Sequence, residues 1–324
     1  MQAELIKRAS ELMEDGTVNR VLGWQKGQFV YDITPAVFTS AEDLKENFVY
    51  NAFCGDNLSK YLRTESEKEG KVLVFLKPCD TYSFNQLLTE YKIKRDNVYV
   101  IGIECNGKTT GEDLRKKGIE GITGISEDGD RLTVNTIYGD EEVSLKDVQS
   151  YRCATCKSRK HVAYDELIGE DGDILDSHRF DQVEEIEKMS AEERFNFWRG
   201  EFSRCIRCNA CRNVCPACTC EKCVFDNYDS GLYNKAAENT FEEQCFHIIR
   251  AYHVAGRCTD CGECSRVCPE HIPLHLLNRK FIKDYDTLYG DFMAGAEVGQ
   301  ISPVVDFTMD NDAEPSIVQK GGAE

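Results

Sequence analysis

Two segments in the C-terminal half of the chain repeat one spacing of cysteines. The first is Cys205-x2-Cys208-x2-Cys211-x3-Cys215 followed by Pro216, and the second is Cys258-x2-Cys261-x2-Cys264-x3-Cys268 followed by Pro269. This spacing is typical of proteins that hold two cubane [4Fe–4S] clusters, where three cysteines of a run bind one cluster and the fourth binds the other. We therefore predict one cluster on Cys205, Cys208, Cys211 and Cys268, and a second on Cys258, Cys261, Cys264 and Cys215.

Zinc is the competing metal, because it also binds Cys-x2-Cys pairs. A zinc finger needs two such pairs well apart in the sequence. Here three cysteines fall within seven residues and are followed by a Cys-Pro step, which suits the faces of a cube. Because this pattern occurs twice, the sequence favours iron–sulfur clusters and electron transfer, and a structural zinc protein without a redox role is the weakest alternative.

The composition limits the other functions that the chain can have. Its 324 residues are enough for two domains, and 17 cysteines without a signal peptide predict a reducing, cytoplasmic location in anaerobic or microaerobic metabolism. No run of 18 apolar residues is present, so we expect no membrane span. The net charge of −18 argues against nucleic-acid binding and suits docking onto basic patches of a partner protein.

The N-terminal region has the pattern of an α/β domain. Residues 72–76 and 98–103 are continuous apolar runs that predict buried strands, and residues 80–91 between them have helical periodicity, with Asp80 as the expected N-cap. Strand, helix and strand in this order predict a parallel sheet. Cys79 and Cys105 follow the two strands, at the edge of the sheet where ligands bind in such folds.

The rest of the chain is expected to be less regular and then helical. Residues 131–145 have the pattern of edge strands, residues 157–180 are polar and loop-like, and a charged helix is predicted over 181–202. Thr240 and Glu243 form a capping-box pattern that opens a helix between the two cysteine runs. Its expected apolar face is made by Phe241, Cys245, Ile248, Ile249 and Tyr252.

These elements predict a fold class and three regions. The fold class is an α/β N-terminal domain with a parallel sheet, residues 1–180, followed by an α-helical dicluster [4Fe–4S] ferredoxin domain, residues 181–288. Residues 289–324 contain seven acidic residues and one lysine. They are either a disordered tail or an arm that lies over a partner subunit.

A resemblance to known proteins supports a third cluster. Cys153-x2-Cys156 is followed by an acidic Gly-Glu-Asp-Gly-Asp segment, and the motifs Lys77-Pro78-Cys79-Asp80 and Gly102-x2-Cys105 precede it. Over roughly residues 50–175 this resembles the beta subunits of deazaflavin-reducing hydrogenases and formate dehydrogenases. The resemblance implies a [4Fe–4S] cluster on Cys79, Cys105, Cys153 and Cys156. The alternative is that Cys79 and Cys105 are ordinary buried thiols and that the pair binds zinc or nothing.

The chain departs from these beta subunits where they bind flavin. In the family a small-residue, glycine-rich loop lies upstream of the Pro-Cys motif, but the corresponding residues 50–58 contain only Gly55. A backbone that approaches a pyrophosphate closely needs glycine. No Gly-x-Gly-x-x-Gly motif is present, and the glycines of 118–124 have the spacing of a turn. Bound FAD is therefore the less favoured hypothesis.

Four more cysteines lie close to the two runs. Cys218, Cys220, Cys223 and Cys245 resemble an element of the beta subunits of sulfhydrogenases and anaerobic sulfite reductases. A fourth [4Fe–4S] cluster on them would use 16 of the 17 cysteines and leave only Cys54. The alternative is that they are small core residues, as free cysteines often are.

Histidine and arginine give weaker signals. The six histidines show no catalytic or metal-binding arrangement. His247 and His253 are expected on a helix surface or in the core, and contact with a cluster is the alternative. Five arginines flank the cysteine runs in an otherwise acidic chain, and they either offset cluster charge or tune potentials and dock an acidic partner. These are Arg204, Arg207, Arg212, Arg257 and Arg266.

The sequence thus predicts an iron–sulfur electron-transfer subunit of an anaerobic oxidoreductase complex, with no catalytic residues of its own. It would relay single electrons between a catalytic subunit and a second redox partner. The expected partners are a flavoprotein, a hydrogenase or formate dehydrogenase, and a heterodisulfide-reductase-like module. In the alternative, the chain carries a flavin, exchanges hydride with nicotinamide or deazaflavin, and uses its clusters as an outlet.

Overall fold

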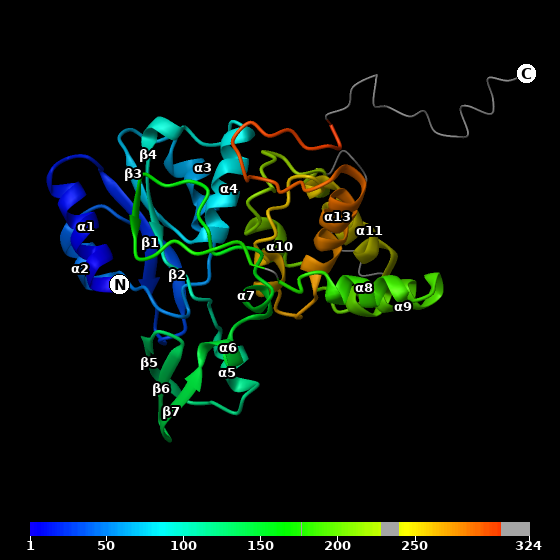
Figure 1. Ribbon diagram of the computed structural model, residues 1–324, viewed down its shortest axis with the longest axis horizontal. Coiled ribbons are helices and arrows are strands. Elements are labelled where there is room, and N and C mark those ends of the chain that lie inside the picture. Colours follow the sequence, from blue (N-terminus) through cyan, green and yellow to red (C-terminus); the bar gives the residue numbers. More distant parts are fainter. Residues whose placement is uncertain (176, 228–239, 306–324) are drawn as a thin grey trace, which may run out of the picture.

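The computed structural model describes residues 1–175, 177–227 and 240–305 (Figure 1). An α/β part formed by the N-terminal residues lies beside a helical part that carries both cysteine runs (Figure 1). This order of the two parts agrees with the prediction. No helix among these residues is long and apolar enough to cross a membrane.

The main sheet has five strands in the order β2-β1-β3-β4-β8. Their bounds are β1 Arg20–Lys26, β2 Ile33–Phe38, β3 Val72–Leu76, β4 Val98–Ile103 and β8 Glu166–Ile168. Strands β1, β3, β4 and β8 pair in parallel, but β2 pairs with β1 antiparallel. The sheet is therefore mixed rather than purely parallel. Only residues 27–32 join β1 to β2, and so short a connection permits a hairpin but no crossover.

Helices cover both faces of this sheet (Figure 1). α1 (Gln2–Glu14) and α2 (Ala41–Asn47) lie on one side and α4 (Pro78–Thr89) on the other. Every residue of β3 is buried, as its continuous apolar run predicts. The predicted strand–helix–strand unit is therefore present as β3, α4 and β4.

The start of α4 differs from the prediction. The helix begins at Pro78, with Lys77 as the N-cap, because proline suits the first helical position. Asp80 is therefore the third helical residue and not the N-cap. Its carboxylate accepts the backbone N–H of Lys77 at 3.3 Å and pairs with the Lys77 ammonium at 2.7 Å.

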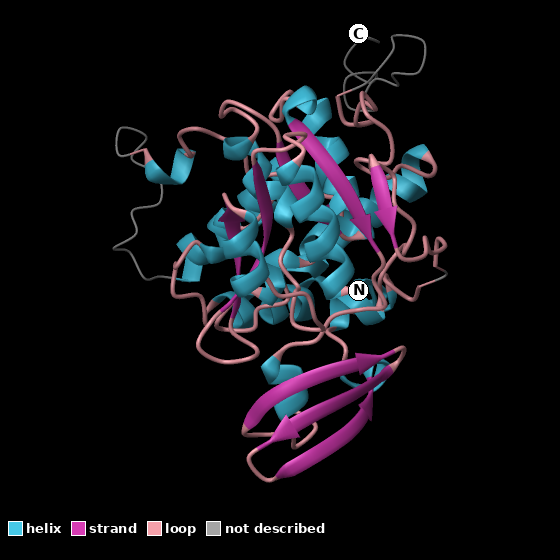
Figure 2. Ribbon diagram, turned by 90° about the vertical axis from the view of Figure 1, so that its left-hand side faces the viewer, coloured by secondary structure: helices cyan, strands magenta, loops and turns pink. Residues whose placement is uncertain are grey.

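A second, three-stranded antiparallel sheet projects from the α/β part (Figure 2). Its strands are β5 Ile122–Asp128, β6 Arg131–Thr136 and β7 Gly139–Ser144. The predicted strands of 131–145 thus exist, but they do not extend the main sheet as edge strands. Two-residue turns connect them, and Leu132 and Val134 pack into a small core of their own with Leu145.

The α/β part also contains short helices, and further helices form the helical part. The short ones are α3 Leu62–Glu65, α5 Gly111–Arg115, α6 Leu145–Val148 and α7 Tyr151–Ala154. The helical part contains α8 Asp181–Lys188, α9 Ala191–Phe202, α10 Ala210–Asn213, α11 Thr240–Val254, α12 Glu263–Arg266 and α13 Leu274–Tyr289. The single helix predicted over 181–202 is broken, because Ser190 caps α9 through a capping box with Glu193.

The buried face of α11 differs from the predicted one. Phe241, Ile248 and Tyr252 are exposed, whereas Phe246 and Val254 are buried. The buried side of the helix packs on the cysteine loops and carries polar residues. The positions of the apolar residues therefore predict the wrong side of the helix as buried. The capping-box side chain of Thr240 lies outside the described residues.

The chain after α13 returns to the α/β part. Ala294 is buried, and the backbone N–H of Gly299 donates to the Thr89 side chain of α4 at 2.9 Å. At Gly295, where φ is +77°, a Cβ atom would lie 1.9 Å from the carbonyl oxygen of Tyr82, so only glycine fits this contact. The last part of the predicted tail or arm, residues 306–324, lies outside the described residues.

Candidate iron–sulfur sites

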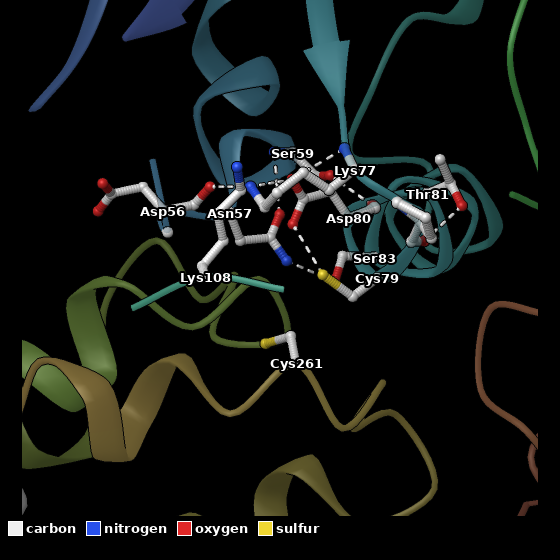
Figure 3. A network of polar contacts seen from close by, with 12 residues as sticks. Asp56, Asn57, Ser59, Lys77, Cys79, Asp80, Thr81, Ser83, Lys108 and Cys261 are labelled. Atoms are coloured by element: carbon white, nitrogen blue, oxygen red, sulfur yellow. Dashed lines mark hydrogen bonds and ion pairs between the residues drawn. The ribbon is translucent and has the colours of Figure 1, made fainter. Parts of the chain in front are cut away.

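One cavity is lined by the four cysteines predicted to hold the third cluster. Cys79 lies in the first turn of α4 after β3, and Cys105 follows β4. Cys153 lies on α7, Cys156 follows it, and all four line the same cavity. Two residues of the second cysteine run, Asp260 and Cys261, complete the wall. Figure 3 shows Cys79 of the α/β part and Cys261 of the helical part facing this region from opposite sides.

Burial makes these thiols poor acids. It raises the pKa of Cys79 and Cys153 above the ordinary value, and that of Cys156 to about 11. These three side chains would therefore become thiolates only with nearby positive charge or a bound metal.

Positive charge does surround this cavity, which is lined by five basic side chains: Lys77, Lys108, Arg152, Lys157 and Arg159. Lys77 is fully buried and donates to the Asp56 carbonyl oxygen at 2.7 Å, while Lys108 donates to the Asn51 carbonyl oxygen at 3.0 Å (Figure 3). Lys157 lies over the Tyr82 ring, and burial lowers its pKa to about 8. Such a cavity fits a group that carries the negative charge of four thiolates.

The two cysteine runs have the same backbone conformation as well as the same spacing. In the first run Arg207 and Asn209 have positive φ angles of 54° and 61°. At the equivalent positions of the second run, Asp260 and Gly262 have φ angles of 57° and 69°. The short helices α10 and α12 then follow at matching places. Each run therefore curls the same way around its cysteines.

The structure brings Cys268 to the first run. Cys205, Cys208, Cys211 and Cys268, the predicted ligands of the first cluster, line a single cavity. Cys211 and Cys268 are buried, whereas Cys208 is exposed. This site therefore reaches the protein surface.

Cys215 in turn lies among the cysteines of the second run. Burial raises the pKa of Cys264 to about 12, and raises those of Cys258 and Cys261 as well. A charge on Cys215 raises each of the three further, which places its sulfur near them. The fourth cysteine of each run thus lies near the first three cysteines of the other run, and the ligand assignment itself stays a prediction.

The predicted fourth set is arranged differently. The thiol of Cys218 pairs with Cys215, which lowers the pKa of Cys215 to about 5. Lys60 supports this pair by donating to the carbonyl oxygens of Cys215 and Cys218 at 3.0 and 2.7 Å. Cys220 is exposed, and Cys223 and Cys245 are half-buried. Cys54, the cysteine left over, is buried in the core of the α/β part.

No three His, Cys, Asp or Glu side chains in the described ranges converge as ligands of one metal ion would.

A buried ionic network joins the two parts of the protein beside these cavities. Arg152, next to Cys153, donates to the Gly55 carbonyl oxygen at 2.7 Å and to that of Cys261 at 3.2 Å. It also pairs with Glu263, which is fully buried and binds Arg266 at 2.8 Å. Although burial favours the neutral carboxyl, Arg266 and Arg152 hold the pKa of Glu263 at about 2. The network therefore holds the two cysteine-lined regions together.

Residues 50–58, where the resembling beta subunits have their flavin loop, are covered by other parts of this chain. Residues 52–59 are all buried. A Cβ atom on Gly55 would lie 2.7 Å from Nη2 of Arg152, so an arginine of this chain already covers the one glycine. The backbone at this loop is not open to a pyrophosphate.

Comparisons with known proteins agree with these features. Residues 201–272 match the family "4Fe-4S dicluster domain", which confirms the prediction of a dicluster domain in this part. The F420-dependent formate dehydrogenase subunit beta of Methanocaldococcus jannaschii is 26% identical over 86% of this chain and 88% of its own length. The chain resembles the beta subunits of F420-dependent formate dehydrogenases.

Two further relatives extend this resemblance. The F420-dependent formate dehydrogenase 1 subunit beta of Methanococcus maripaludis is 25% identical over 68% of this chain and 73% of its own length. Sulfhydrogenase 2 subunit beta of Pyrococcus furiosus is 22% identical over 64% of this chain and 73% of its own length. Both predicted resemblances, to dehydrogenase and to sulfhydrogenase beta subunits, are thereby confirmed.

Sequence reasoning did not identify a buried arginine between the two runs. Arg250 of α11 is 4% exposed and donates to the Cys211 carbonyl oxygen at 2.9 Å. Burial lowers its pKa, but four surrounding cysteines outweigh that effect and raise it. The sequence feature that could have indicated this residue is a single arginine among the apolar residues of 248–251. His247, expected in the core or on a helix surface, is buried and lines the cavity of the first run.

The flanking arginines mostly pair with carboxylates. Arg212 binds Asp226 at 2.8 Å, within the helical part. Arg257 pairs with Glu90, and Arg266 with Asp56, across the boundary between the two parts. These two arginines contribute to the assembly of the fold.

Proposed function

We propose that this chain is an iron–sulfur subunit that relays single electrons within an oxidoreductase complex. The proposal rests on the observation that a residue of one predicted cluster site also lines the cavity of another. Cys261, a predicted ligand of the second dicluster site, lines the cavity of Cys79, Cys105, Cys153 and Cys156. When bound, [4Fe–4S] clusters supply one-electron transfer at potentials set by their surroundings.

The described residues support a line of three such sites. Cys79, Cys105, Cys153 and Cys156 would hold the first, and Cys258, Cys261, Cys264 and Cys215 the second. Cys205, Cys208, Cys211 and Cys268 would hold the third. Arg250 lies between the last two sets, and the exposed Cys208 gives the far end of the line access to a partner.

The partners we propose follow from the relatives. Their names identify subunits of formate dehydrogenase and sulfhydrogenase. We therefore propose a cytoplasmic, anaerobic complex in which this chain connects such a catalytic subunit with a second redox partner. A flavoprotein or a heterodisulfide-reductase-like module would suit the second position. The closed loop at Gly55 favours a flavin on the partner rather than on this chain.

Metal and flavin analysis tests this proposal. We expect about 12 iron atoms and 12 sulfides per chain and no flavin in protein purified without oxygen, since three cubanes hold four irons each. EPR of the reduced protein should show interacting clusters. About 8 irons would contradict the cluster in the α/β part, and about 16 would assign Cys218, Cys220, Cys223 and Cys245 as ligands. Stoichiometric flavin would favour the alternative in which this chain exchanges hydride, whereas zinc without iron would exclude electron transfer.

A further inference from the structure

His247 is positioned toward the cavity of the first cysteine run. It lies on α11, is 2% exposed, and lines the cavity together with Cys205, Cys208, Cys211 and Cys268. Its ring is held by aromatic neighbours. Phe202 stacks on it at a centroid distance of 4.7 Å and an angle of 20°, and Phe246 meets it nearly edge-on at 5.0 Å and 77°.

The polar atoms of this ring have no hydrogen-bond partner in the described part of the chain. Both Nδ1 and Nε2 of His247 are buried and unpaired there. A buried donor without a partner is destabilising, so such groups are rare unless a ligand or water satisfies them. An imidazole ring carries at least one N–H donor in either protonation state. The buried ring of His247 therefore brings a donor to the wall of this cavity.

We propose that His247 donates this N–H to a sulfur atom of the cluster held by Cys205, Cys208, Cys211 and Cys268, and so raises its reduction potential. This inference rests on the proposed function, because it requires a cluster in that cavity. The reduced cluster carries one more negative charge than the oxidised one, so a hydrogen bond to its sulfur is stronger in the reduced state. The aromatic neighbours fix the ring, which leaves His247 as a positioned donor rather than a metal ligand.

Replacement of the histidine tests the effect on potential. In His247→Leu we expect the iron content to stay unchanged and the ratio of reduced to oxidised cluster to fall about tenfold at a given ambient potential, equivalent to ~59 mV for one electron. EPR-monitored redox titration measures this shift, and the signal is assigned by its loss in Cys211→Ala. His247→Asn keeps a donor and should recover much of the shift. His253→Leu, an exposed histidine of the same helix, should change nothing.

Two results separate failure of this inference from failure of the proposed function. Full iron content with an unchanged potential in His247→Leu would overturn the role of His247 and leave the electron-transfer proposal intact. Absence of iron from the wild-type protein would overturn both.

A measurement on the unmodified chain covers the case in which the variants lose the cluster. In protein labelled with [15N]histidine, pulsed EPR of the reduced cluster should detect a coupled 15N nucleus. If no such coupling is found, His247 makes no hydrogen bond to the cluster.

Discussion

Cys264→Ala should lose one cluster, about four iron atoms per chain, while the α/β part stays folded. Cys264 is buried on α12 beside Cys215, at the centre of the second dicluster site. An alanine there removes one of the four thiolates predicted to bind the second cluster. The measurement is iron and sulfide content, with EPR to identify the missing signal and circular dichroism to confirm the fold.

Matched cysteine variants show whether the loss depends on ligation. Cys54→Ala removes a cysteine that is just as buried but lies in the apolar core, so its iron content should stay at the wild-type value. Cys153→Ala should lose about four irons from the other cavity and keep the dicluster signals. Unchanged iron in Cys264→Ala, or equal losses in Cys54→Ala, would refute the ligand assignment.

Glu263→Gln should lower the free energy of unfolding by about 1.5–3 kcal/mol, because it removes the carboxylate that two part-buried arginines share. Glu263 is fully buried between Arg152 and Arg266, and these contacts join the helical part to the α/β part. Anaerobic urea unfolding at neutral pH, followed by tryptophan fluorescence, measures the change. The control is Glu142→Gln on β7, whose pair with Arg131 is exposed and should contribute less than about 1 kcal/mol.

The same carboxylate predicts a dependence on pH. The pKa of Glu263 is lowered from an ordinary value of 4.5 to about 2 in the folded protein. Its contribution to stability is therefore complete above pH 4.5 and is lost as the pH falls toward 2. The difference in unfolding free energy between the wild type and Glu263→Gln should shrink over this interval. A difference that stays constant from pH 5 to pH 3 would show that Glu263 is not held as a carboxylate by the two arginines.

Patterns of apolar residues in the sequence predicted correctly those strands in which nearly every residue is buried. Strands β3 and β4 are continuous apolar runs because both faces of the sheet are covered, and the helix between them follows from its own periodicity. The antiparallel β2 and the separate sheet of β5, β6 and β7 were not predicted as such. Their strands are short and half-exposed. The apolar periodicity of a strand does not determine which other strand it pairs with.

The buried face of α11 is a second feature that the sequence pattern predicted wrongly. The sequence indicates Phe241, Ile248 and Tyr252 as the buried stripe, but the structure buries Glu243, His247 and Arg250 instead. Polar side chains are buried there because they face the cysteine loops. Apolar periodicity finds helices that pack on an apolar core, and it fails where the neighbour is a charged site.

By itself, the sequence determined the two cysteine runs and the chemistry they predict. Three thiols within seven residues are placed by a local loop, and the same left-handed positions recur in both runs. Only the tertiary structure decided that Cys261 lines the cavity of Cys79, Cys105, Cys153 and Cys156, and that His247 points at the first run. The contacts that bring the cavities together, such as Arg152 with Cys261, span more than a hundred residues. They depend on how the α/β part packs against the helical part, and no local spacing of residues encodes that packing.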